Sequence, residues 1–278
     1  MQLLCYSNKR GDITVKGVFA CPCCMETNFL GAIFEECYSD DDIDVYQCPR
    51  CNSKFLVASR NDKYRILFDY AIISLQDDYF NNAVLNAYMS LEEFMKSFIK
   101  LALYKHHTDI ETIVEFLKSI NLAENKKGAF LLSYFQQFNK IISKNKWDGF
   151  TKLRNKIIHD GKFVNKKDAY DYCEKMYEFI NGILSEISKK YNKDDCSSID
   201  FAFQEYYNKK YNSKLSKISS FVPSILPELG STSEKTFAQA YENFKGAKTY
   251  CYKNPIKKMD AELKKYLQTM CNMKDIDK

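Results

Sequence analysis

Three residues within one short stretch of the chain, Arg154, Asn155 and His159, combine side chains that can cleave RNA without a metal ion. A histidine titrates near neutral pH, so it can take a proton from a ribose 2′-hydroxyl or give one to the leaving 5′-oxygen. An arginine can neutralise the charge that builds on the phosphorane oxygens, and an asparagine can orient the phosphate or the imidazole. One copy of the motif supplies one histidine, so acid and base would both be present if two copies met across a two-fold dimer.

A single helix is expected to carry the three residues. Asn155 and His159 are spaced i,i+4 and share one face, while apolar neighbours at the same spacing predict the buried face. Arg154 lies about 100° from Asn155 around the helix, close enough for all three side chains to aim at one surface. Gly161 is expected to end the helix as its C′ residue. His159 then lies in the last turn, where the helix dipole favours the imidazolium ion.

A purely structural role is the competing interpretation of this stretch. The same arginine and histidine could cap backbone carbonyls at the helix end or pair with Asp148 or Asp160. The other two histidines of the chain, His106 and His107, are adjacent at the expected end of another helix. We interpret them as solvated helix-terminal residues without a role in function.

Two C-P-x-C pairs near the N-terminus predict a zinc site. Each pair places two thiolates on a tight turn, and two such turns complete a tetrahedral site. The expected ligands are Cys21, Cys24, Cys48 and Cys51. The pattern resembles a zinc ribbon, and four thiolates leave no open position for water, so the zinc is expected to be structural. Cys23 or Cys37 could replace a ligand, whereas a redox pair would need a βαβ context that the flanking sequence lacks.

Hydrophobic periodicity predicts a mainly α fold, a bundle of five or six helices preceded by the small β-rich ribbon. Apolar residues spaced four and three apart from Phe80 to Leu101 predict one long helix of about six turns. Short apolar stretches at 15–19 and 55–57 predict strands beside the cysteine turns. Further helices are expected over residues 63–75, 110–120, 131–141, 150–157 and 169–191.

The chain is therefore expected to have three parts. The predicted parts are the zinc ribbon at residues 1–60, the helical bundle at 61–192 and a basic, partly helical C-terminal region at 193–278. Within the C-terminal region, weaker periodicity predicts short helices near 201–211, 237–244 and 258–270.

Composition and charge restrict the class of protein. In 278 residues, 45% apolar and 28% charged residues are enough for a folded core. No apolar run approaches the roughly 20 residues of a membrane span, and the first ten residues lack a secretory signal, so we expect a cytoplasmic protein with no membrane partner. The net charge is +5, and the segment Glu205–Lys278 contains 14 Lys against 8 acidic residues. This balance suits an RNA or DNA partner, although a solvated lysine-rich surface has the same composition.

The motif R-N-x-x-x-H-x-G, together with the helical run from Asp78 to Glu92, resembles the HEPN superfamily of all-helical domains. The resemblance covers roughly residues 61–192. It implies a homodimer that pools two R-x4–6-H motifs and cleaves RNA without a metal ion, leaving 2′,3′-cyclic phosphate and 5′-hydroxyl ends. By this resemblance Arg154 and His159 are the catalytic pair and Asn155 is the polar residue between them. Glu92 would be the acidic residue of the long second helix, with Glu93 as the alternative.

The same resemblance implies a biological setting. HEPN proteins occur widely in antiviral defence, in abortive infection and as toxins in toxin–antitoxin pairs, so an activating or inhibitory partner protein is expected. Some members of the superfamily have lost cleavage. A zinc-ribbon helical module that binds nucleic acid or a protein without cutting is therefore the alternative hypothesis.

Overall fold

The computed structural model describes most of the chain. The described residues are 4–9, 12–20, 33–37, 43–47, 50–59, 63–210, 217–220 and 224–244. Contacts within the chain divide it into two units, one of residues 1–59, 215–222 and 243–278, the other of residues 60–214 and 223–242. The expected C-terminal region is therefore shared between the two units.

The second unit is helical, which confirms the mainly α fold. Its helices are α2 (Lys63–Gln76), α3 (Phe80–Lys105), α4 (Ile110–Ser119), α5 (Ala123–Phe138), α6 (Lys144–Asp160), α7 (Lys166–Lys190) and α8 (Lys193–Lys210). Residues 237–244 are helical too, as predicted, whereas the helix predicted at 258–270 falls outside the described residues. Among the described helices, none has the length and apolar character needed to cross a membrane.

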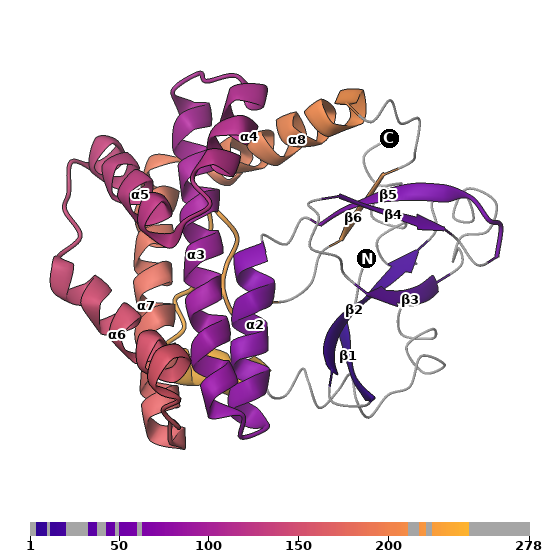
Figure 1. The fold of residues 1–278 in the computed structure, drawn as a ribbon. Helices are drawn as coiled ribbons and strands as arrows, with labels where there is room; N and C mark the ends of the chain where they lie inside the picture. Colours follow the sequence, from indigo (N-terminus) through magenta and orange to yellow (C-terminus); the bar gives the residue numbers. More distant parts are fainter. Residues whose placement is uncertain are drawn as a thin grey trace. The chain divides into compact units, whose positions relative to one another are not determined.

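Helix α3 forms the centre of the helical unit, with α2, α5, α6 and α7 packed against it (Figure 1). The predicted stripe from Phe80 to Leu101 is its buried face: Phe80 is partly exposed at the helix start and the other six residues of the stripe are buried. The 4-3 spacing keeps those side chains on one side of the helix, which is why periodicity alone located α3. In the core, the Phe98 and Phe130 rings meet edge to face with their centroids 5.2 Å apart.

The helix predicted at 131–141 differs from the observed α5. The observed helix begins at Ala123, and periodicity missed this start because the first two turns are polar and carry no apolar stripe. It ends where Asn139 takes up a left-handed conformation with φ 52°, so Ile141 lies beyond the helix and its side chain is 86% exposed. Lys126, in the polar first part of α5, is nevertheless buried.

Polar side chains of α2 hold the segment 224–228. Asp69 accepts hydrogen bonds from the Ser224 hydroxyl (2.9 Å) and from the backbone N–H of Ile225 (3.0 Å). The Arg65 guanidinium donates to the carbonyl oxygen of Leu226 (3.0 Å). Both Asp69 and Arg65 are almost fully buried, so the helical unit includes this segment as part of its core.

The first unit contains two three-stranded sheets. Its strands are β1 (Leu4–Lys9), β2 (Asp12–Ala20), β3 (Ile33–Cys37), β4 (Ile43–Gln47), β5 (Lys54–Ser59) and β6 (Lys217–Ser220). One sheet has the order β1-β2-β3 and is antiparallel throughout; the other has the order β4-β5-β6, and β6 pairs parallel to β5. The strands predicted at 15–19 and 55–57 lie within β2 and β5.

Candidate functional site

Helix α6 carries the predicted motif and ends as expected. Gly161 takes up a left-handed conformation with φ 61° at the C-terminus of the helix. The backbone N–H of Lys162 then donates to the carbonyl oxygen of Lys156 (3.0 Å), a bond that closes the last turn. His159 accordingly lies in the last turn of α6.

Arg154 is held between two neighbours. Its guanidinium carbon lies 5.3 Å from the centroid of the Tyr88 ring on α3, and its Nη1 donates to the Asn155 side-chain oxygen (3.0 Å). The pKa of the Tyr88 hydroxyl is raised, mainly by burial and secondly by the Glu92 carboxylate. The ring therefore stays neutral next to the guanidinium. Arg154 and Asn155 are therefore brought together, at the contact between α3 and α6.

His159 presents its side chain to solvent one turn after Asn155. Among the described side chains and the backbone of residues 63–210, its imidazole makes no hydrogen bond or ion pair. Over the same residues, neither Asp148 nor Asp160 pairs with Arg154 or His159. The arginine and the histidine of the motif are thus available to a ligand.

Glu92 lies one turn after Tyr88 on α3, but its main contact is structural. Its Oε2 accepts a hydrogen bond from Lys126 Nζ at 2.7 Å, an ion pair that joins α3 to α5. The neighbouring Glu93 pairs with Lys96 one turn further along α3. Glu92 and Arg154 both lie close enough to Tyr88 to shift the pKa of its hydroxyl, Glu92 upward and Arg154 downward.

The other histidines lie at the opposite end of α3. Asn81, in the first turn of α3, donates to the carbonyl oxygen of Lys162, just after the motif, whereas His106 caps the last turn of α3. Because each helical residue adds about 1.5 Å, the two ends are about 37 Å apart. His106 is exposed, as expected, but its ring also forms a hydrogen bond with the buried Gln137 (2.9 Å). His107 lines a separate pocket of about 740 Å³. One chain therefore cannot bring two histidines together at the motif.

Asn81 is a positioning residue that periodicity did not reveal. Its side-chain N–H donates to the carbonyl oxygen of Lys162 (3.0 Å), and its side-chain oxygen accepts from the backbone N–H of Val164 (2.9 Å). This amide fixes the loop that follows His159 to the start of α3. In the sequence, Asn81 stands out only as a member of the helical run from Asp78 to Glu92. That position does not reveal which backbone groups its side chain binds.

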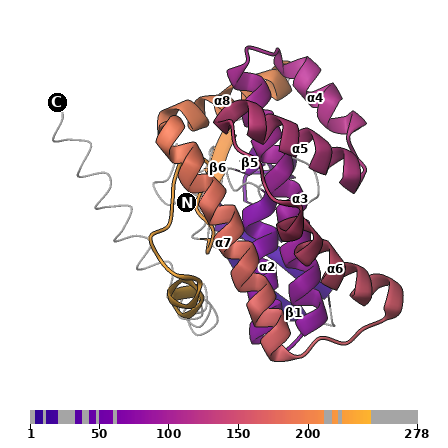
Figure 2. The same cartoon turned by 90° about the vertical axis from the view of Figure 1, so that its left-hand side faces the viewer.

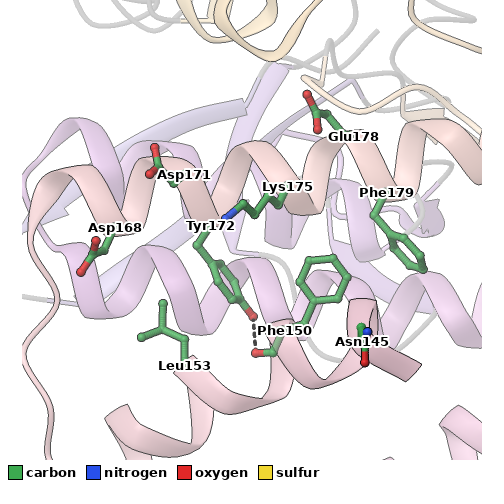
Figure 3. Close-up of a pocket in the computed structure, with 10 residues that line it drawn as sticks. Asn145, Phe150, Leu153, Asp168, Asp171, Tyr172, Lys175, Glu178 and Phe179 are labelled. Carbon is green, nitrogen blue, oxygen red and sulfur yellow. Dashed lines mark hydrogen bonds between the residues drawn. The ribbon is translucent and has the colours of Figure 1, made fainter. Parts of the chain in front are cut away.

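Residues 161–165 join α6 to α7 (Figure 2), and the two helices line a groove of about 580 Å³ (Figure 3). The Tyr172 hydroxyl donates to the carbonyl oxygen of Phe150 (3.0 Å) across its floor. The charged groups that line it are Asp168, Asp171, Glu178 and Lys175. The excess of negative charge disfavours binding of a phosphate in this groove. Leu153 lines the groove, whereas the next residue, Arg154, contacts Tyr88, so the groove does not include the arginine of the motif.

Of the four predicted zinc ligands, Cys51 alone belongs to the described residues. It is exposed, in the connection between the antiparallel strands β4 and β5, and the following Asn52 is left-handed with φ 58°. A tight turn between paired strands suits a metal-binding knuckle. Cys21, Cys24 and Cys48, together with Cys23, lie outside the described residues, and the described part holds no cluster of three or more potential ligands. The zinc site stays a prediction.

The chain matches no protein-family model, no curated protein and no solved structure. Membership of the HEPN superfamily is accordingly still a prediction. It depends on the R-N-x-x-x-H-x-G motif and on the helical pattern around it.

Proposed function

We propose that the protein is a metal-independent endoribonuclease of HEPN type whose site is composed of Arg154, Asn155 and His159 from two copies of the chain. The single observation that carries this proposal is the state of the motif at the end of α6. An arginine is fixed against Tyr88, and the histidine five residues later is exposed and makes no hydrogen bond or ion pair with the described side chains of residues 63–210. An oriented arginine and an exposed histidine are the groups that metal-independent cleavage of RNA requires.

The chemistry follows from these side chains. One imidazole takes the proton of the ribose 2′-hydroxyl, and the 2′-oxygen attacks the adjacent phosphorus. The second imidazole gives a proton to the 5′-oxygen as the P–O5′ bond breaks. The products are a 2′,3′-cyclic phosphate and a 5′-hydroxyl. Arg154 neutralises the charge on the phosphorane oxygens, and its bond from Nη1 to Asn155 keeps the guanidinium oriented.

Two copies are needed because one chain has a single histidine at the motif. His106 and His107 lie at the other end of α3, about 37 Å from Asn81, which binds the loop after the motif. A two-fold axis beside the end of α6 would bring two His159 side chains to one phosphate. The zinc ion of the predicted ribbon is structural in this proposal and takes no part in cleavage.

A role in antiviral defence, in abortive infection or as a toxin is part of the same proposal. It rests on the HEPN resemblance, and so does the expectation of an activating or inhibitory partner protein. The cytoplasmic location expected from the sequence fits action on cellular or invading RNA.

The first test is cleavage of single-stranded RNA by the full chain in the presence of EDTA. His159→Ala and Arg154→Ala should each lower cleavage at least about 100-fold. His107→Ala is the matched control, because this exposed histidine lies far from the motif and its loss should leave cleavage unchanged. Cleavage by His159→Ala at the wild-type rate would end the proposal.

A second test addresses the dimer. Wild-type and His159→Ala chains are mixed and allowed to exchange subunits. If both histidines act on one phosphate, activity should fall with the square of the wild-type fraction, since only dimers of two wild-type chains cut. A linear fall would show that each chain acts alone.

The alternative is a binding module that cuts nothing. It is favoured by the basic stretch from Lys152 to Lys167, which would attract RNA whether or not cleavage follows. RNA binding by both the wild-type chain and His159→Ala, with no cleavage by either at any concentration, would select this alternative.

A further inference from the structure

We propose that Phe163 is a stacking platform for an unpaired base of the RNA bound at the end of α6. This inference rests on the proposed function, because it assigns the substrate of that site as single-stranded. Phe163 follows His159 by four residues in the sequence. Its side chain is 90% exposed, more than any other large apolar side chain in the described residues.

The exposure of Phe163 is built into the loop. The carbonyl of Lys162 and the N–H of Val164, on either side of it, are both bound by the Asn81 side chain (3.0 and 2.9 Å). Val164 is itself buried, with 6% of its surface exposed. The backbone is therefore fixed immediately before and after the phenyl ring, which points to solvent from a held position.

The surroundings of Phe163 are basic. The segment from Lys152 to Lys167 contains six Lys or Arg residues and one acidic residue, Asp160; Lys166 is paired with Asp78 (3.1 Å), and Asp168 follows the segment. Lys152, Lys156 and Lys162 are exposed. Positive charge around a free aromatic ring is the combination that single-stranded nucleic acids bind, through phosphates and stacked bases.

A protein partner would be expected to find a wider apolar surface. Within Lys152–Lys167, all of which the structure describes, Ile158 is the one other large apolar side chain that is strongly exposed, at 47%. Both apolar side chains stand among lysines, whereas the centre of a protein interface is depleted of charge. The charge around the ring therefore favours RNA as the occupant of Phe163 itself, and the second chain of the proposed dimer would pack beside the ring.

The test measures binding separately from cleavage. In a His159→Ala background, the full chain is titrated against a fluorescent single-stranded oligoribonucleotide and against a duplex of the same length. Phe163→Ala should weaken single-strand binding about tenfold, the loss expected for one stacked base, and leave duplex binding unchanged. Phe163→Trp, which keeps a large aromatic ring, should bind the single strand as tightly as the chain with Phe163. Phe201→Ala is the control, because Phe201 is also well exposed (62%) but lies on α8.

Several outcomes would overturn the inference. Unchanged single-strand binding by Phe163→Ala would do so, and so would an equal loss for the duplex. A change from dimer to monomer in sedimentation, with single-strand binding per chain retained, would assign the ring to a protein interface. Single-strand binding that depends on Phe163 in a chain that never cleaves would keep the stacking platform and end the nuclease proposal. Cleavage by the wild-type chain, with single-strand binding that does not depend on Phe163, would keep the nuclease proposal and end the stacking platform.

Discussion

Replacing Glu92 with glutamine should reveal whether this residue stabilises the fold or takes part in cleavage. Its carboxylate lies 2.7 Å from Lys126 Nζ, and the Lys126 side chain is only 8% exposed. Glutamine keeps the shape and one acceptor oxygen but removes the charge. The Lys126 ammonium would then be left in the interior without a counter-ion.

The expected loss is about 2 kcal/mol in the free energy of unfolding. Removing one partner of a fully buried ion pair costs about 3–5 kcal/mol. The Glu92 side chain is 19% exposed, so water can reach part of the site, and the amide oxygen still accepts a bond from Lys126. Both effects reduce the penalty.

Glu93 provides the matched control because it is the next residue on α3. It pairs with Lys96 on the same helix, and those side chains are 20% and 33% exposed. Glu93→Gln should therefore cost less than about 0.5 kcal/mol. The double variant Glu92→Gln/Lys126→Met should recover most of the loss, because it removes both members of the buried pair.

Urea denaturation followed by circular dichroism measures these differences, provided that the slope with urea is the same for each variant. Equal small losses for Glu92→Gln and Glu93→Gln would refute the argument from burial. A 100-fold loss of cleavage by Glu92→Gln, with stability unchanged, would instead assign Glu92 to the chemistry.

Three further predictions concern other parts of the chain. Burial raises the pKa of Asp69 to about 7, so the folded state keeps its proton at pH values where the unfolded state has lost it. The stabilisation from the neutral carboxyl should be complete below about pH 4 and be lost as the pH rises to 7. In thermal unfolding, Asp69→Asn should remove this pH dependence and be more stable than wild type at about pH 8. Gly161→Ala should cost about 1 kcal/mol, because φ is 61° and no atom stands where its Cβ would go, and Gly161→Asn should cost less. Metal analysis should find one zinc per chain, lost in Cys48→Ser and kept in Cys23→Ser.

The sequence predicted most where one side of an element is uniformly apolar. The stripe from Phe80 to Leu101 located α3, and Gly161 correctly marked the end of α6 because few other residues accept its backbone conformation. The start of α5 was missed because the buried residue in its first turns is Lys126, whose burial depends on a carboxylate from another helix. The role of Asn81 was missed for the same reason: its partners lie 81 and 83 residues away in the sequence.

The two side chains proposed to be catalytic, Arg154 and His159, differ in how they are held, and this difference favours the proposed shared site. Arg154 is fixed by Tyr88 and Asn155, so its charge is in place before a substrate arrives. His159 stands in solvent, where water competes for every proton it could transfer. Proton transfer to RNA needs an imidazole within hydrogen-bond reach of the reacting oxygen, and excluding water strengthens the electrostatic interactions there. A second copy of the chain, packed against the end of α6, would provide that shielding and the second imidazole in one step.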